Sequence, residues 1–490
     1  ESGPASYTCM RVLITGATGF IGRALVPRLQ RDGHSVVAWV RSESRARGLL
    51  GADVDLVPAS RGHNALVDAL AGVDAVVNLA GEALIGKRWT PDRRRVLEES
   101  RVGVTTDLVR AIAAATPRPR VLVSGSAVGW YGDRGDEPLS ETSKPGGDFL
   151  AHLCRDWENA ARAADVSGVR VVLLRTGVVL GRNGGALAQM LPPFKLGAGG
   201  PIGNGRQYLP WIHLHDLVSA VAVIIADERY RGPVNGVAPE EATSRTFAAA
   251  LGRALHRPAI LPTPAFVLRA LFGEAATVLL ASQRVAPAVL AGHGFTFAFP
   301  TLDAALADIV GSGSIAIGPR TTAGPRSGAP AGNGAAAGTA ARYELRTTTV
   351  VDAPLAETFA FFSRAENLGL ITPAAMQFTL TRAAQPITEG AQMEYRMRVG
   401  PATIRWRSRI TVWEPGRRFV DVQEVGPYRV WWHEHAFRAD GPRTVMEDRV
   451  LYAPPLGALG RIANRMFVAP ALTRIFQYRG DVIRLRFGAA

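Results

Sequence analysis

Three glycines near the N-terminus have the spacing of a dinucleotide-binding turn. Gly16, Gly19 and Gly22 follow the apolar run 12–15, and a helix-like segment and a second apolar run, 35–40, come next. One glycine lets the chain turn tightly, one lets backbone N–H groups approach a pyrophosphate, and one lets the helix pack close to the strand. The segment therefore predicts a nucleotide cofactor site. The alternative is a glycine-rich turn that binds nothing.

The residues after the second apolar run bear on the choice of cofactor. NAD-preferring sites usually place Asp or Glu there, on the ribose hydroxyls, but this chain has Arg41 and Ser42. A cation and a hydroxyl suit a 2′-phosphate better. The sequence therefore favours NADP(H) over NAD(H), with Arg41 as the phosphate ligand. The alternative is that Arg41 is a solvated residue at a helix start.

Apolar strand-like runs alternate with helix-like segments through this part of the chain. The runs lie at 11–15, 35–40, 75–79, 120–124 and 169–175. This rhythm predicts an α/β fold with a Rossmann-like, doubly wound parallel sheet. Ligands of such sheets bind beyond the carboxyl ends of the strands, so the residues after each run are candidates for the site.

Composition divides the chain into four parts. Residues 1–9 form a loose tail, and 10–310 form the nucleotide-binding domain, with a helical, apolar substrate subdomain at about 240–305. The Gly/Ala/Pro/Thr-rich stretch 311–342 has almost no large apolar residue, which predicts a flexible linker. Residues 343–490 form a second domain.

The overall composition excludes several classes of function. With 47% hydrophobic residues, the 490-residue chain can bury substantial cores. The formal charge is +14, but the basic residues are dispersed, so no nucleic-acid partner is expected. No segment has the apolar length of a membrane span, so no stable membrane insertion is expected. Only Cys9 and Cys154 are present, which argues against a disulfide framework and favours a cytoplasmic protein.

Six motifs follow one another in a fixed order over about residues 10–310. They are the glycine turn and the segments 74–81, 124–126, 174–181, 211–216 and 235–237. Together they resemble the extended short-chain dehydrogenase/reductases, in the NAD(P)-dependent epimerase/dehydratase branch. Shorter motifs resemble an atypical subgroup named epimerase family protein or cell-division inhibitor; they are Gly81-Glu82, Arg88-Trp89, Ser100-Arg101, Pro145 to Phe149, Trp157-Glu158 and Gly200 to Gly203.

The resemblance implies a set of residues around the cofactor. The segment 79–81 would pass beside it, and Arg101 and Val179 would face it, although Arg101 could equally be a charge on a helix surface. The expected cofactor-binding residues are Gly16, Thr18, Gly19, Phe20, Ile21, Gly22, Arg41, Ser42, Leu79, Ala80, Gly81, Arg101, Ser124, Thr176 and Val179.

The proton-transfer pair of this family is missing. Family chemistry uses a Tyr four residues before a Lys, whose cation lowers the pKa of the phenol. The chain contains no such pair, and alignment on Glu158 puts Leu150 and Cys154 at the two positions. Leu cannot transfer a proton and Cys is a poor substitute for a fixed cation. An ordinary sugar-nucleotide epimerase is therefore disfavoured.

Two polar residues remain near the predicted nicotinamide. Ser126 stands at the position that resembles the catalytic Ser/Thr of the family, and Tyr131 follows it closely. We expect Ser126 to hydrogen-bond a carbonyl substrate and Tyr131 to donate a proton. The alternative is that Ser126 is a turn residue and that Tyr131 packs in the core.

The segment 182–211 has the position and the Gly/Pro content of a substrate loop. Its apolar content argues against a strongly charged nucleotide-sugar. Arg206, Gln207 and the neighbouring His213 are candidate substrate contacts, with a purely structural role as the alternative for each.

The second domain begins with a strand at 343–351, continues through alternating strands to about residue 451 and ends in a long helix at 459–486, kinked at Pro470. This order resembles the START-like polyketide-cyclase/lipid-transport (SRPBCC) superfamily, an α+β helix-grip fold around an apolar cavity. The resemblance implies a small apolar molecule as ligand. His433 and His435 share one strand face, but no third ligand is evident, so no metal site is expected.

The sequence thus predicts an atypical NADP(H)-dependent reductase of the epimerase type, fused to a hydrophobic-ligand-binding domain. The substrate would be an apolar carbonyl compound, with hydride from the nicotinamide and a proton from Tyr131 or water. The missing Tyr/Lys pair leaves open a competing class, an NADP(H)-binding sensor or ligand-binding protein without turnover. The oligomeric state is left open.

Overall fold

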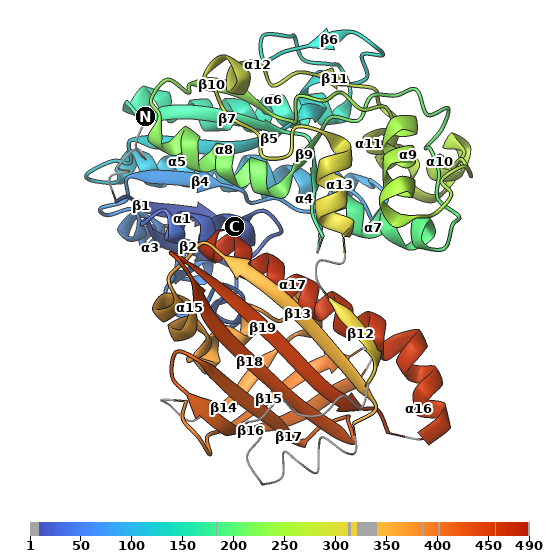
Figure 1. Cartoon of the computed structure of the whole chain (residues 1–490). Coiled ribbons are helices and arrows are strands. Elements are labelled where there is room, and N and C mark those ends of the chain that lie inside the picture. The colour runs from blue at the N-terminus through green and yellow to red at the C-terminus, as the bar shows by residue number, and fades with distance from the viewer. Residues whose placement is uncertain are drawn as a thin grey trace. The chain divides into compact units, whose positions relative to one another are not determined.

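The structure is a computed structural model of the chain (Figure 1). It describes residues 9–182, 184–311, 315–320, 341–383, 387–399, 402–455 and 457–488. The chain divides into two compact units between residues 311 and 312, and the short stretch 47–53 is grouped with the second unit. Each unit has its own sheet and its own hydrophobic core.

The first unit is built on a seven-stranded parallel sheet with the order β10-β7-β5-β4-β1-β2-β3. Its strands are β1 (Arg11–Thr15), β2 (Ser35–Val40), β3 (Asp55–Pro58), β4 (Ala75–Asn78), β5 (Val121–Ala127), β7 (Arg170–Thr176) and β10 (Gly232–Gly236). The inner strands are buried on both faces, which is why they read as continuous apolar runs in the sequence. The predicted doubly wound parallel sheet is confirmed, and β3 and β10 extend it beyond the predicted strands.

Helices cover both faces of this sheet. On one face, α3 (Gly62–Ala69), α5 (Val104–Ala114) and α6 (Phe149–Arg162) pack side by side over a core of alternate strand residues. On the other face, α1 (Gly22–Arg31) packs against α8 (Leu214–Ala226). The strand order reverses direction between β1 and β4, so the carboxyl ends of these two strands mark the expected ligand site.

A mostly helical subdomain is formed by segments that lie after β7 and after β10 in the chain. Its helices are α7 (Gly185–Lys195), α9 (Ser244–Leu255), α10 (Ala265–Phe272), α11 (Thr277–Leu280), α12 (Ala288–Gly292) and α13 (Leu302–Val310). Helices α7, α9 and α13 share an apolar core with a two-stranded sheet of β8 (Val178–Leu180) and β9 (Trp211–His213). A second small sheet pairs β6 (Pro138–Leu139) with β11 (Arg284–Val285).

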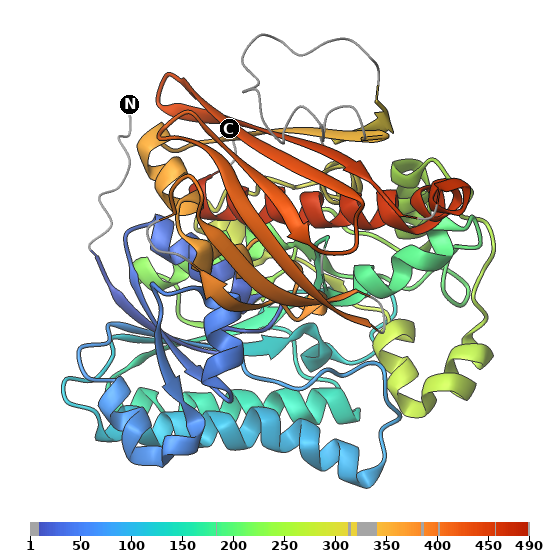
Figure 2. The same ribbon diagram turned by 90° about the horizontal axis from the view of Figure 1, so that it is seen from below.

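The second unit is an eight-stranded antiparallel sheet with the order β12-β13-β19-β18-β17-β16-β15-β14. Its strands are β12 (Ala316–Pro319), β13 (Tyr343–Val351), β14 (Thr379–Ala383), β15 (Gln392–Val399), β16 (Ala402–Glu414), β17 (Arg418–Val425), β18 (Val430–Asp440) and β19 (Arg443–Ala453). The long helix α17 (Ala469–Phe487) runs along one face of this sheet, as Figures 1 and 2 show. Aromatic side chains of α15 (Leu355–Phe362) and of the strands fill the core beneath it.

Two expectations about this unit are corrected. Residues 316–319 fall in the predicted linker but form β12, because they pair with β13 and Ile317 packs on the core. Most of the remaining linker, and the predicted tail except Cys9, lie outside the described residues. The kink was predicted at Pro470, but the interruption of the α-helix is the π-helical stretch Asn464–Val468, between α16 (Gly457–Ala463) and α17. Pro470 lies in the first turn of α17, where its missing N–H removes no hydrogen bond of the helix. No described helix is long and apolar enough to cross a membrane.

Candidate functional site

The glycine turn lies at the carboxyl end of β1, and its glycines are sterically required. Gly16 has φ +69°, and a Cβ on it would lie 2.5 Å from the carbonyl oxygen of Leu79, in the segment after β4. Gly22 opens α1, and a Cβ there would lie 2.5 Å from the Gly16 carbonyl oxygen. The Gly19 N–H donates to that same oxygen at 2.9 Å. The turn therefore holds the N-terminus of α1 against the end of β4, where a pyrophosphate is expected to bind.

A second group of glycines surrounds the Phe20 ring. A Cβ built on Gly181, Gly184 or Gly185 would come within 3.0 Å of a ring atom of Phe20. These glycines follow β8, so the ring fixes the start of α1 against the helical subdomain. The sequence analysis named Phe20 but missed its partners, although three glycines within five residues were a visible signal.

The segment after β4 is held from outside by Arg101. Its Nη2 donates to the Glu82 carbonyl oxygen at 2.8 Å, and a Cβ on Gly81 would lie 3.3 Å from its Cζ. Arg101 stands in a π-helical turn, Glu99–Gly103, which joins α4 (Pro91–Glu98) to α5. Its guanidinium lies over the Trp157 ring at 5.4 Å, and burial lowers its pKa. Arg101 is buried, so it is not a charge on the helix surface, and its predicted position facing the cofactor stays a prediction.

A buried chain of hydrogen bonds holds the same segment from inside. The Thr15 hydroxyl donates to Asn78 Oδ1 at 2.6 Å, and Asn78 Nδ2 donates to the Thr105 hydroxyl at 2.8 Å. Trp157 Nε1 also donates to Thr105, at 2.9 Å, and the Ala80 N–H donates to Thr15 at 3.3 Å. The sequence analysis missed Asn78 and Thr105 as positioning residues. Asn78 ends an otherwise apolar strand run, and that was the available signal.

Arg41 and Ser42 lie exposed at the end of β2. The Arg41 side chain is 90% exposed, and its Nη1 lies 3.4 Å from Glu82 Oε1. Glu82 also pairs with Arg93, at 3.5 Å. An exposed ion pair of this kind contributes little, so Arg41 can exchange it for an incoming phosphate at small cost.

The remaining predicted cofactor residues differ in how they are placed. Thr18 and Ile21 are half-buried on the glycine turn, and Val179 is half-buried in β8. Ser124 is fully buried behind Asn78, whose Nδ2 lies 3.5 Å from its hydroxyl. Thr176 hydrogen-bonds through its hydroxyl to the Leu174 carbonyl oxygen, at 3.3 Å.

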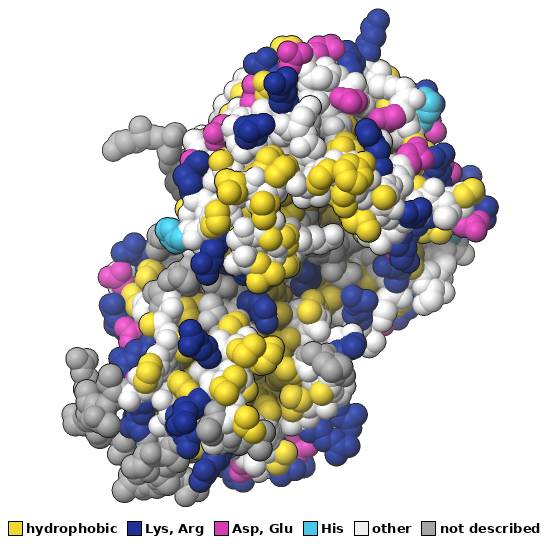
Figure 3. All heavy atoms as spheres, turned by 90° about the vertical axis from the view of Figure 1, so that its right-hand side faces the viewer, with side chains coloured by type: hydrophobic (Ala, Val, Ile, Leu, Met, Phe, Trp, Pro, Cys, Tyr) yellow, Lys and Arg dark blue, Asp and Glu magenta, His cyan; other side chains and the backbone are white. Residues whose placement is uncertain are grey.

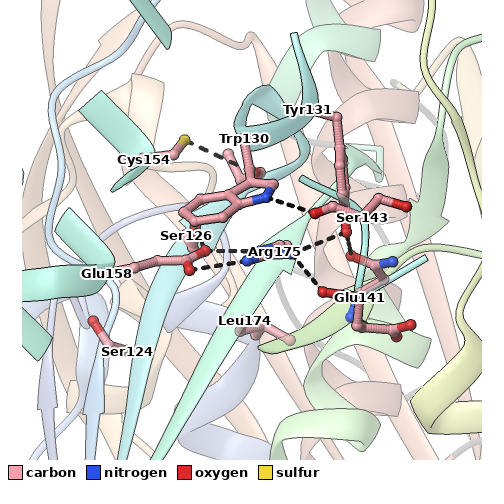
Figure 4. A network of polar contacts seen from close by, with 12 residues as sticks. Ser124, Ser126, Trp130, Tyr131, Glu141, Ser143, Cys154, Glu158, Leu174 and Arg175 are labelled. Carbon is pink, nitrogen blue, oxygen red and sulfur yellow. Dashed lines mark hydrogen bonds and ion pairs between the residues drawn. The ribbon is translucent and has the colours of Figure 1, made fainter. Parts of the chain in front are cut away.

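The predicted catalytic residue Ser126 lies in a buried ionic network (Figure 4). Its hydroxyl donates to Glu158 Oε1 at 2.8 Å. The same carboxylate accepts two hydrogen bonds from Arg175, at 2.8 and 3.0 Å, and one from Arg162 at 3.2 Å. Glu158 is fully buried and Arg175 nearly so, which makes this bidentate ion pair a central structural element beneath the site.

Tyr131 belongs to the same network (Figure 4). Its hydroxyl donates to Asn235 Oδ1 at 2.7 Å and accepts from Arg175 Nη1 at 3.2 Å. Burial raises the pKa of Tyr131, and Arg175 opposes that shift only in part. The ring is fully buried and the phenolic proton is committed to Asn235, an arrangement that matches the packing alternative. The sequence analysis missed Arg175, whose signal was a charge at the end of the apolar run 171–174.

Leu150 and Cys154, at the positions of the missing Tyr/Lys pair, are buried. Leu150 and Cys154 lie on the face of α6 that packs against Gly129, where a Cβ would be 3.3 Å from Leu150 Cβ. The Cys154 thiol points at the Ala127 carbonyl oxygen at 3.7 Å, and burial raises its pKa to about 12. Neither side chain supplies an acid or a base near neutral pH.

Two of the three predicted substrate contacts have structural partners. Gln207 Nε2 donates to the Ile202 carbonyl oxygen at 3.0 Å. His213 caps α8, because its Nδ1 accepts the His215 N–H at 3.1 Å, and its ring packs tilted against Phe299 with 4.0 Å between the ring centroids. The Arg206 side chain is exposed.

Comparisons with known families cover the first unit. Residues 12–235 match the NAD dependent epimerase/dehydratase family, and residues 263–309 match a domain of unknown function, DUF1731.

Two relatives and one solved structure resemble this chain over most of their own length. The chloroplastic homolog of epimerase family protein SDR39U1 from Arabidopsis thaliana is 42% identical over 307 residues, which are 61% of this chain and 87% of the relative. The human epimerase family protein SDR39U1 is 41% identical over 306 residues, which are 61% of this chain and 100% of the relative. A crystal structure of human SDR39U1 (isoform 2) with NADPH matches with a TM-score of 0.56 and 38% identity, over 61% of this chain and 99% of that chain.

Proposed function

The chain belongs to the NAD dependent epimerase/dehydratase family, and from that premise we propose that it is an atypical NADP(H)-dependent reductase. The main support is the glycine turn after β1, which has no room for a side chain at Gly16 or Gly22. Arg41 lies exposed at the end of the neighbouring strand β2. The human relative crystallised with NADPH supports the same cofactor for this chain.

Different residues around the turn bind different parts of the cofactor. Backbone N–H groups of the turn and the N-terminus of α1 bind the pyrophosphate. Arg41 and Ser42 bind the 2′-phosphate, where a guanidinium gives charge-assisted hydrogen bonds. Arg101 and Asn78 hold the segment 79–81 in place from its two sides.

When bound, NADPH supplies a hydride at the nicotinamide. Leu150 and Cys154 stand at the two positions of the family's Tyr/Lys pair, and their buried side chains offer no acid or base near neutral pH. Water is therefore the simplest source of the proton. The catalytic roles of Ser126 and Tyr131 stay predictions, since each hydroxyl would have to leave a buried partner first.

We expect an apolar carbonyl compound as substrate, because the helical subdomain is apolar outside as well as inside. Hydrophobic side chains gather on the face of the first unit that is turned toward the viewer in Figure 3. The large exposed apolar residues on or beside α7 and α10 are Leu196, Ile260, Leu261, Phe266 and Leu271. An exposed patch of this kind suits an apolar ligand rather than a charged sugar nucleotide.

For the second unit we propose a START-like, hydrophobic-ligand-binding role. The support is its architecture: an antiparallel sheet along which one long helix packs, with aromatic residues between them. In this role the unit captures or presents the apolar molecule that the first unit reduces.

Calorimetric titration of NADPH and NADH tests the cofactor assignment. We expect NADPH to bind more tightly than NADH, and Arg41→Ala to weaken NADPH about 10- to 100-fold, since hydrogen bonds to charged groups contribute about 1.5–3 kcal/mol. NADH binding should change little. Arg110→Ala, which removes an exposed arginine of α5, is the matched control. Equal weakening of both nucleotides by Arg41→Ala, or no binding of either, would contradict the assignment.

The second candidate function is NADP(H) binding without turnover. The buried Leu150 and Cys154, at the positions of the family's Tyr/Lys pair, favour it. A panel of apolar ketones, aldehydes and quinones, followed by NADPH absorbance, decides between the two. A substrate-dependent loss of NADPH absorbance would eliminate the function without turnover. Tight NADPH binding with no turnover across the panel would argue against the reductase.

A further inference from the structure

Three adjacent strands of the second unit bring four charged or imidazole side chains together on the inner face of the sheet. They are Asp421 on β17, His433 and His435 on β18, and Asp448 on β19. Asp421 is paired across the strands with His433, and Asp448 with His435. Both histidines and Asp448 are buried, and the Asp421 side chain is 14% exposed. Burying polar side chains in an aromatic core costs free energy, so we expect this cluster to have a specific role.

One face of this cluster has the spacing of metal ligands. Asp421 Oδ1 lies 3.4 Å from His433 Nδ1 and 3.4 Å from His435 Nε2. All three atoms lie within 4.8 Å of one another. Two ligands that each lie about 2.0–2.1 Å from a tetrahedral Zn²⁺ are about 3.3 Å apart. The distances therefore match the edges of a small coordination shell around one ion.

The opposite face supplies the partner that metal-binding histidines usually have. Asp448 Oδ1 lies 2.6 Å from His435 Nδ1 and 3.2 Å from His433 Nε2. Arg479 Nη2 also lies 2.9 Å from His435 Nδ1, so a carboxylate and a guanidinium both flank this nitrogen. A carboxylate that accepts the outer N–H of a ligating histidine fixes the ring and its tautomer. Asp448 is placed to do this for His433, whose Nε2 forms a hydrogen bond with it, and it also contacts the outer nitrogen of His435.

We propose that Asp421, His433 and His435 bind one divalent transition-metal ion, with Zn²⁺ as the best match. Imidazole and carboxylate ligands suit this ion, and three protein ligands leave one position for water or for an oxygen atom of a bound molecule. Aromatic rings enclose the site: Phe419 stacks on His435 at 4.2 Å, and Phe476 packs edge-on against His433 at 5.5 Å.

Titration of the full chain with Co²⁺, after removal of bound metal by a chelator, tests the proposal. We expect one ion per chain, the visible absorption of four-coordinate Co²⁺, and its displacement by Zn²⁺. His433→Gln and His435→Gln should abolish this absorption. Asp448→Asn should weaken binding about 10- to 100-fold, as is typical when the partner of a ligating histidine is lost.

Glu434→Gln is the matched control. Glu434 lies between the two histidines on β18 but faces the other side of the sheet, where it pairs with Arg418 at 3.0 Å. It should bind Co²⁺ as the wild type does. Circular dichroism and NADPH binding report whether each variant has folded.

Three results would overturn the proposal: no stoichiometric ion on the wild-type chain, unchanged binding in the folded histidine variants, or equal loss in Glu434→Gln. If a histidine variant does not fold, X-ray absorption of the Zn²⁺-loaded wild type decides instead. A shell with two imidazole ligands supports the site, and a shell with one or none rejects it.

Discussion

The ion pair between Glu158 and Arg175 is the most deeply buried charge pair of the first unit's described part, with both side chains at most 2% exposed. Six further groups belong to the network: the hydroxyls of Ser126 and Tyr131, the Asn235 amide, the Glu141 carbonyl, the Trp130 ring and the Arg162 guanidinium. The desolvation free energy of a buried ion pair is offset only when every hydrogen-bonding partner is present. The residues predicted to be catalytic are therefore parts of a structural network.

The substitution Tyr131→Phe separates the structural role from the catalytic one. It leaves buried Asn235 Oδ1 without its donor, so we expect the first unit to lose about 1–3 kcal/mol of stability. NADPH affinity should be unchanged. Urea unfolding of the first unit and calorimetry measure the two quantities. Unchanged stability together with abolished turnover would instead identify Tyr131 as the proton donor.

Cys154 should resist alkylation in the folded protein. Its thiol is buried and its pKa is raised to about 12, so almost no thiolate is present at pH 8. Cys9 is exposed. Mass spectrometry after brief iodoacetamide treatment at pH 8 should find Cys9 modified and Cys154 modified only after denaturation. Rapid modification of native Cys154 would mean that the contact with Leu150 opens.

At the scale of elements, two loops and one π-helical turn set the shape of the cofactor site. The turn after β1 and the glycines after β8 meet at the Phe20 ring, and the π-helical turn before α5 aims Arg101 at the segment after β4. Insertions of this kind inside helices are often found at functional sites. The residues of the candidate site therefore lie in the loops and turns at the ends of strands and helices.

The substitution Gly184→Ala tests the contact between the two loops. Its Cβ would overlap the Phe20 ring, so we expect a loss of about 1–3 kcal/mol in stability and weaker NADPH binding, because the start of α1 must shift. Gly292→Ala is the control, since a Cβ there meets no atom within 4 Å. Thermal unfolding and calorimetry measure both effects. Equal results for the two variants would show that Phe20 does not position the turn.

The whole molecule consists of two units with separate hydrophobic cores. The core of the second unit draws its residues from positions 345–487, and the cores of the first unit end at residue 309. The human relative is matched over 100% of its length by 306 residues of this chain. A unit that corresponds to an entire relative and has its own core is expected to fold by itself.

The fragment 1–311 should therefore fold and bind NADPH with the affinity of the full chain. We also expect two thermal transitions in the full chain, of which the fragment keeps one. Calorimetry and circular dichroism check both expectations. A fragment that is unfolded or fails to bind NADPH would show that the first unit depends on the second.

Much of the fold could be predicted because it depends on local patterns. The strands β1 and β2 have the predicted bounds, and β13 begins and ends where expected, since continuous or alternating apolar runs are read directly from neighbouring residues. The glycine turn is equally local. The short strands β3 and β10 and the strand β12 within a polar stretch were missed, because sheet pairing rather than local composition decides them.

The sequence by itself determined which residues could bind a dinucleotide and that the Tyr/Lys pair is absent. Only the tertiary structure decided which polar side chains meet. The partners of Arg175 come from positions 131, 141 and 158, and Asp421 joins His433 and His435 through strand register. A single shift in register would turn these side chains to the other face of the sheet. Contacts between distant residues depend on topology and register, which no local pattern contains.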